Sequence, residues 1–210
     1  MCSLQGPSAK VVAGTAPNIA TWYIPQALLI ANSEYFHTAC AEPIKKGIVR
    51  KIVLLDCKPE LFQPFVQWMY FATLPASETF GPCEEFQLWS LGDKLGASGF
   101  KDTLMTEIHS LFAFDASRPS PCFFTTEEAE WCWTQTEHGS RLRNFFLDTF
   151  PQHWTYLVEY SKNKTAWLGL LAEHPDLSSF LLSALASKDV GREEALDTKP
   201  VAAYLEMPKN

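Results

Sequence analysis

Hydrophobic positions divide the chain into a mixed first half and a helical second half. Branched and aromatic residues in short runs predict strands at 10–14, 20–24 and 48–55. Apolar residues spaced three and four apart predict helices in the same half, at 26–31, 36–40, 59–70, 84–95 and 100–112. The order strand, strand, helix, helix, strand and then helices is typical of the α+β fold class.

Helical spacing continues beyond residue 116. Thr125–Glu128 reads as a capping box, which predicts the start of a helix carrying Trp131 and Trp133. The next helix has one apolar face, formed by Leu142, Phe145, Phe146 and Phe150. Pro151 is expected to end that helix, because proline lacks the amide proton that a helix interior requires. The sequence of residues 165–186 predicts one or two further helices.

These patterns predict four segments. Residues 1–8 form a flexible lead, 9–115 an α+β domain, 116–187 an all-helical C-terminal extension and 188–210 a disordered tail. The tail follows from its polar, mixed-charge composition.

Composition narrows the classes of function. The chain has 210 residues, of which 47% are hydrophobic and 20% charged, as expected of a globular protein. Its net charge of -7 repels phosphates, so we expect no nucleic-acid partner. We find no secretory leader and no apolar run near the roughly 18 residues that span a bilayer. We therefore expect a soluble, intracellular protein, cytoplasmic or nuclear, without a membrane partner.

Sequence motifs for chemistry are absent. The six cysteines include no C-x-x-C pair, which argues against a disulfide framework or a zinc knuckle. His37 and Cys40 lie three apart on a predicted helix, but no further ligand has suitable spacing. The glycine-rich phosphate and dinucleotide motifs and the nucleophile elbow do not occur. We therefore expect no enzyme, no cofactor and no metal.

Four ordered pieces of sequence carry a family resemblance. They are Ala27–Phe36, Ile52–Asp56, Phe62-x-x-Phe65-x-x-Trp68-Met-Tyr70 and Trp89-x-x-Gly-Asp-Lys-Leu95. In this order they resemble the core of a BTB/POZ domain, as found in small fungal proteins. His138–Arg143 with Phe146–Asp148 is similar to a Gly-Ser-x-Leu-Arg helix that follows the core in many fungal members.

The resemblance implies a fold and a type of function. Residues 9–115 would form a BTB/POZ-like small sheet with clustered helices, followed by the all-helical extension. The chain would be a non-catalytic protein–protein interaction module with a protein partner. It would act either as an adaptor that recruits that partner to a cullin ubiquitin ligase or as a self-associating scaffold. The sequence leaves the oligomeric state open, although the short stretch before the first strand disfavours a strand-swapped dimer.

Six residues are the candidate contacts with a partner: Cys40, Glu42, Ile44, Phe71, Leu74 and Phe80. Cys40-Ala-Glu42 stands where cullin-binding family members carry a hydrophobic-x-Glu motif. For Trp68 and Tyr70 we favour core packing over an exposed binding ledge, because burying an aromatic ring removes a large apolar area from water.

The alternative from another class is a small glutathione-transferase-like enzyme. Tyr23 and Pro25 resemble the thiol-activating residue and the proline turn of that fold. The fold requires a strand after this proline, whereas Gln26–Ala31 predicts a helix.

Overall fold

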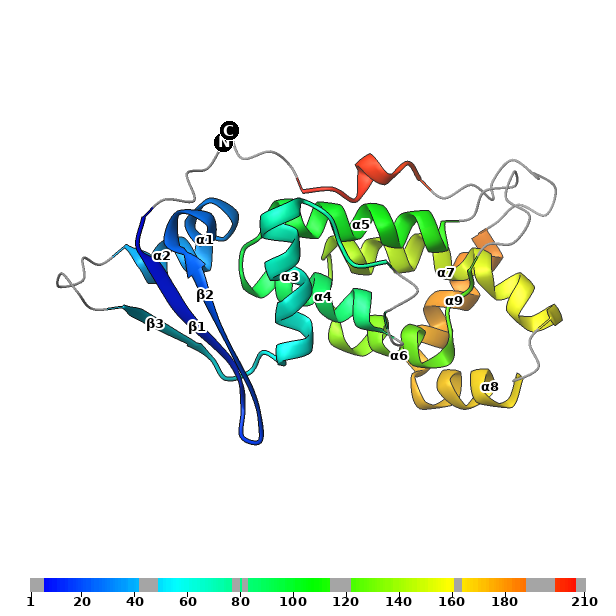
Figure 1. The fold of residues 1–210 in the computed structure, drawn as a ribbon. Helices are drawn as coiled ribbons and strands as arrows, with labels where there is room; N and C mark the ends of the chain where they lie inside the picture. Colours follow the sequence, from blue (N-terminus) through cyan, green and yellow to red (C-terminus); the bar gives the residue numbers. More distant parts are fainter. Residues whose placement is uncertain are drawn as a thin grey trace. The chain divides into compact units, whose positions relative to one another are not determined.

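The computed structural model describes residues 6–41, 49–76, 80, 83–113, 122–160, 164–187 and 199–206. They form an α+β protein of two compact units that divide between Leu104 and Met105, inside helix α5 (Ser98–Phe112). The first unit contains the sheet, and the second is helical (Figure 1). This division precedes the sequence-based boundary at 115, because the last two turns of α5 pack with the helices of the second unit.

A three-stranded sheet organises the first unit. Strand β1 (Ser8–Thr15) pairs antiparallel with β2 (Asn18–Pro25) and parallel with β3 (Arg50–Leu54), which gives the order β2-β1-β3. A parallel pair needs a long crossover. Helices α1 (Gln26–Asn32) and α2 (Glu34–Cys40) lie within it. The predicted strands and both short helices are therefore confirmed, with ends shifted by one or two residues.

One face of this sheet is buried. Val11 lies at its centre, opposite Trp22 on β2 and Ile52 on β3. The buried positions alternate along the strands, as period-two side chains require: Ala9, Val11, Ala13, Ile24, Ile52 and Leu54. Strand residues that point the other way, such as Tyr23 and Val53, are exposed.

Aromatic rings fill the core beside the sheet. Helix α3 (Pro59–Phe71) supplies Phe62 and Phe65, which are both 0% exposed. The Phe65 ring centroid lies 5.0 Å from that of Phe100 and 6.4 Å from that of Phe36. Such edge-on and stacked contacts add to the hydrophobic gain of burial. The apolar stripe predicted for α3 is thus a core face.

The Gly-Asp-Lys-Leu run on α4 (Glu84–Lys94) holds the start of α5. Lys101 extends along α4, donating to Asp93 at 2.6 Å and lying 4.7 Å from the Trp89 ring centroid. A Cβ at Gly92 would come within 2.9 Å of the Lys101 side chain. Only glycine therefore leaves room for this packing, and these motif residues have a structural role.

Four helices build most of the second unit: α6 (Thr126–Gln135), α7 (Arg141–Tyr160), α8 (Lys164–Glu173) and α9 (Pro175–Ser187). The predicted capping box is confirmed, since Thr125 and Glu128 exchange side-chain to backbone hydrogen bonds at 2.8 and 3.2 Å. The predicted apolar face of α7 is also confirmed, because all four of its residues are 0% exposed.

The expectation that Pro151 ends this helix is wrong. Helix α7 continues through Pro151 to Tyr160. Side chains bind backbone carbonyls around the proline: Thr149 Oγ1 donates to Phe145 O at 2.8 Å, and Gln152 Nε2 donates to Asp148 O at 3.0 Å. Trp154, beyond the proline, contacts Phe150 ring to ring at 6.0 Å. Tertiary packing and these bonds outweigh the lost helix bond.

Part of the predicted disordered tail is ordered. Residues 199–206 contain a short 3-10 helix, η3 (Val201–Ala203), and Tyr204 is only 2% exposed. The prediction rested on the composition of residues 188–210 as a whole, which is polar although 201–205 are mostly apolar. At the other end β1 begins at Ser8, inside the predicted lead. Residues 1–5, 188–198 and 207–210 lie outside the described part.

Among the helices that the structure describes, none is long and apolar enough to cross a bilayer.

Candidate protein-binding surface

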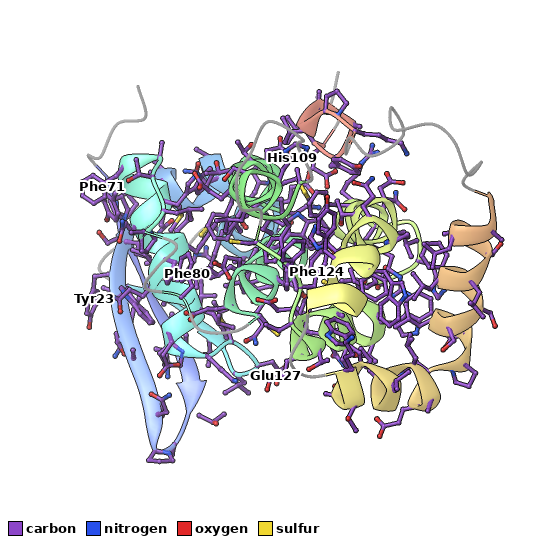
Figure 2. All side chains as sticks on the ribbon, turned by 90° about the vertical axis from the view of Figure 1, so that its right-hand side faces the viewer. Tyr23, Phe71, Phe80, His109, Phe124 and Glu127 are labelled. Atoms are coloured by element: carbon purple, nitrogen blue, oxygen red, sulfur yellow. The ribbon has the colours of Figure 1, made fainter. Side chains whose placement is uncertain are left out.

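The six predicted contact residues come from two segments. Cys40 is half-buried at the end of α2, while Glu42 and Ile44 lie outside the described residues. Phe71 ends α3 with 71% of its surface exposed. Leu74 and Phe80 follow it and are half-buried. Figure 2 shows Phe71 on the outer side of the first unit. Phe71 is therefore the most accessible of the four residues that the structure describes.

The end of α3 explains this exposure. Ala72 adopts a left-handed φ of 54°, and its N–H donates to Trp68 O at 2.7 Å. Met69 faces the core, and Tyr70, about 100° further round the helix, turns outward. Tyr70 is 40% exposed and its ring lies 6.2 Å from that of Phe71. The expectation that Tyr70 packs in the core is therefore wrong, whereas Trp68 is partly buried against Phe65.

Cys40 lacks the features of a reactive thiol. Partial burial raises its thiol pKa, and the nearby positive charge of Arg50 opposes this only in part. Arg50 Nη1 donates to Ala39 O at 2.6 Å, next to Cys40 in the chain. Burial also raises the pKa of Cys57, to about 11. Both thiols stay protonated near neutral pH, so they suit packing rather than nucleophilic attack.

The structure brings together a surface that the sequence reasoning missed. Two neighbouring hollows in the first unit share Tyr35 and Lys94. One also contacts Thr38 on α2, and the other contacts Val53 and Leu55 at the end of β3. We call these five residues the Tyr35 surface. Tyr35, Val53 and Leu55 are 40%, 41% and 62% exposed, so three large apolar side chains border the two hollows.

Hydrogen bonds fix the backbone at the start of α2, where Tyr35 lies. Ser33 caps α2 by accepting from Phe36 N–H at 3.2 Å, and its hydroxyl donates to Leu95 O at 2.6 Å. The Tyr35 N–H donates to the same Leu95 carbonyl at 3.2 Å. Gly96 has φ +59°, and a Cβ there would lie 2.9 Å from Glu34 Cβ. The turn after α4 therefore requires glycine and fixes the start of α2.

A signal for this surface is present in the sequence. Tyr35 and Phe36 are adjacent on a helix, so they cannot both face one core. Phe36 is 0% exposed, and Tyr35 makes an edge contact with it at 5.2 Å. Likewise Val53 and Leu55 alternate with the buried Ile52 and Leu54. Treating Tyr35-Phe36 only as part of a motif concealed the difference between the two rings.

One group of metal-ligand types occurs among the described residues. The ligand atoms of Glu130, Glu173 and His174 lie within 4.8 Å of one another in the second unit. Carboxylates with an imidazole suit several divalent cations. Both glutamates are exposed, and such surface groups also occur without an ion, so we assign no metal here. His37 and Cys40 belong to no such group within the described ranges.

The histidine with the most strongly shifted pKa is buried in the second unit. His153 is 0% exposed, and its Nε2 lies 2.7 Å from Phe112 O, so Nε2–H donates because a carbonyl only accepts. Its Nδ1 accepts from Phe124 N–H at 3.4 Å. Burial lowers the pKa of His153 to about 4, although the bond to Phe112 opposes this. The neutral ring therefore joins three segments of this unit.

We expect His153 to make the second unit less stable in acid. Its folded pKa of about 4 lies below the ordinary 6.5, so the unfolded chain binds more protons between these values. The stability that the neutral His153 ring contributes is complete above pH 6.5. It falls as the pH drops toward 4, by on the order of 3 kcal/mol in total. Denaturant unfolding at several pH values measures it. In His153→Gln the unfolding free energy should depend less steeply on pH in this window. The slope should fall by the amount that corresponds to about one bound proton.

His138→Gln is the matched control, because His138 is exposed. That variant should keep the wild-type slope. An unchanged slope in His153→Gln would contradict the assignment of the acid sensitivity to the buried ring.

Comparison with known proteins adds no relative. No protein-family model matches this chain, and a search of curated proteins found no match.

Proposed function

We propose that this chain is a non-catalytic protein–protein interaction module of BTB/POZ type that docks a partner protein on the Tyr35 surface. The observation that carries the proposal is the set of exposed apolar side chains, Tyr35, Val53 and Leu55, on a backbone held by Ser33 and the Leu95–Gly96 turn. Aromatic residues dominate the binding energy of protein interfaces, and a surface that is already ordered loses less entropy on binding.

Two features support the BTB/POZ part of the proposal. The observed order of strands and helices agrees with the order that the hydrophobic pattern predicts, and the four resembling pieces of sequence lie within it. Six apolar residues of the resembling helices are buried, whereas Tyr35 and Tyr70 in the same pieces are exposed. The buried ones are Phe62, Phe65, Met69, Trp89, Leu91 and Leu95. The buried motif residues thus form the scaffold, which leaves recognition to exposed residues such as Tyr35.

The glutathione-transferase-like alternative lacks its required element. Helix α1 begins at Gln26, directly after Pro25, where that fold needs a strand. Tyr23, the residue that would activate a thiol, is 63% exposed on the outer side of the sheet. No observation favours this enzyme over the interaction module.

A cullin scaffold is the partner proposed for the adaptor form. Cys40 and Phe71 would add contacts at the ends of α2 and α3, and the self-associating form would use the same surface between copies. A pull-down of purified cullin N-terminal domains by the full chain tests the adaptor. Failure to bind at micromolar concentration, with an intact circular dichroism spectrum, would defeat it. Light scattering on the free chain tests self-association.

Tyr35→Ala should weaken binding to a retained partner by about tenfold or more, because it removes a central aromatic anchor. Partners are first identified by affinity purification and mass spectrometry, and affinity is then measured by calorimetry. Tyr23→Ala is the matched control, since this exposed tyrosine lies outside the Tyr35 surface. It should bind as wild type does. Equal affinity for Tyr35→Ala and wild type would refute the surface while leaving the fold assignment untouched.

A further inference from the structure

A C-terminal segment, residues 199–206, lies against α5 and α7 within the second unit (Figure 1). His109 Nε2 donates to the Lys199 carbonyl at 2.8 Å. Figure 2 shows His109 on α5 beside η3. Eleven residues of largely polar sequence, 188–198, separate this segment from the end of α9. The segment is therefore an addition to the four-helix unit rather than a continuation of it.

One carboxylate binds both ends of the segment. Asp148 Oδ2 accepts from Lys199 Nζ at 2.8 Å and from Tyr204 Oη at 2.9 Å. Burial raises the pKa of Tyr204 well above its ordinary value, and the negative charge of Asp148 raises it further. The phenol consequently stays protonated and donates. Asp148 thus recognises a basic residue and a tyrosine five positions later.

The tyrosine ring supplies the apolar part of the contact. Tyr204 is 2% exposed and meets Phe145 edge-on at 5.2 Å. The His109 ring lies 6.1 Å away. Phe145 and His109 come from different helices, so together with Asp148 they form an aromatic site with an acidic side. A buried tyrosine with a satisfied hydroxyl is typical of an interface anchor.

We infer that His109, Phe145 and Asp148 form a peptide-recognition site for a Lys-Pro-x-x-x-Tyr sequence, which the chain's own residues 199–206 occupy as a separable ligand. The contacts of this segment with α5 and α7 include two side-chain donors, one backbone carbonyl and one aromatic ring, and a peptide of the same sequence would offer the same groups in trans. Lys199 is 63% exposed, so its ion pair adds specificity more than affinity. This inference is independent of the proposed BTB/POZ function.

The test uses the full-length Tyr204→Ala chain, in which the resident segment has lost its anchor. A fluorescein-labelled peptide of residues 199–206 is titrated into it and followed by anisotropy. We expect saturable binding with Kd on the order of 100 µM. The wild-type chain should bind the peptide about tenfold more weakly, because a tethered segment competes at an effective concentration of about 1 mM.

Variants locate the site. Adding Asp148→Asn to Tyr204→Ala should weaken peptide binding about fivefold or more. A peptide with phenylalanine for tyrosine should also bind less tightly, because it lacks the donor to Asp148. A phosphotyrosine peptide should not bind, since its phosphate would face the Asp148 carboxylate. Weaker binding in the first two cases and no binding in the third, with retention for the unmodified peptide, supports the inference.

Three results would overturn it. The first is no saturable binding to a Tyr204→Ala chain that keeps its circular dichroism spectrum. The second is equal binding to wild type and Tyr204→Ala, and the third is indifference to Asp148→Asn. If Tyr204→Ala does not fold, a protease site is placed within 188–198 of the full chain. Release of the cut segment and its replacement by labelled peptide would then support the inference, and a segment that never exchanges would overturn it.

Discussion

Phe65→Ala is expected to destabilise the first unit by about 3–5 kcal/mol. Phe65 is 0% exposed and contacts four aromatic rings at centroid distances of 5.0–6.4 Å: those of Phe36, Phe62, Trp68 and Phe100. Alanine removes the apolar burial and leaves a cavity that rigid neighbouring rings cannot fill. Denaturant unfolding followed by near-ultraviolet circular dichroism measures the loss.

Phe71→Ala is the matched control on the same helix, because Phe71 is 71% exposed. It should change stability by less than about 0.5 kcal/mol. If this variant cost as much as Phe65→Ala, the exposed end of α3 would carry packing that the structure does not assign to it.

Arg143→Ala should destabilise the second unit by about 3 kcal/mol or more. Arg143 is 2% exposed, and its Nη1 donates to the carbonyls of Cys132, at 2.9 Å, and Trp133. Its guanidinium carbon lies 3.9 Å from the Trp133 ring centroid. The side chain therefore satisfies the last carbonyls of α6 and places positive charge at the negative end of that helix. Alanine would remove the Arg143 donor from both carbonyls, while Thr136 Oγ1 would still donate to Cys132 O.

Two variants separate the causes of this loss. Arg143→Lys keeps the charge but loses the planar fork, so we expect a smaller loss of about 1–2 kcal/mol. Arg141→Ala, two residues earlier and half-buried, should cost less than about 0.5 kcal/mol. Hydrogen exchange should show the opening in α6 while the first-unit amides keep their protection. Equal stability of Arg143→Ala and wild type would contradict the capping role.

Local patterns predicted most of the fold. The ranges of β1, β2 and β3, the helix after Pro25 and the capping box at Thr125 all follow from periodicity, proline and turn chemistry acting over a few residues. The buried faces of α3 and α7 follow from three- and four-residue spacing in the same way. Such signals are local, so the α+β class could be inferred without the contacts between distant segments.

The candidate site was predicted less well. The sequence singled out Phe71, which is exposed, but it also pointed to Cys40, which is partly buried. It overlooked Tyr35, Val53 and Leu55, because their exposure depends on which neighbouring side chains the core accepts. An aromatic residue in a motif can lie in the core or on an exposed surface, and its residue type does not show which.

The sequence by itself determined which stretches form strands and helices and which side of each is apolar. Only the tertiary structure decided that α7 passes through Pro151, that residues 199–206 are ordered and that Tyr35 faces outward. These outcomes rest on contacts between residues far apart in the chain, such as Ser33 with Leu95 and Asp148 with Tyr204. The hydrophobic pattern identifies which side chains need to be buried, and backbone chemistry identifies which polar groups need a hydrogen-bond partner. Which residues they contact is decided only when distant segments of the chain pack together.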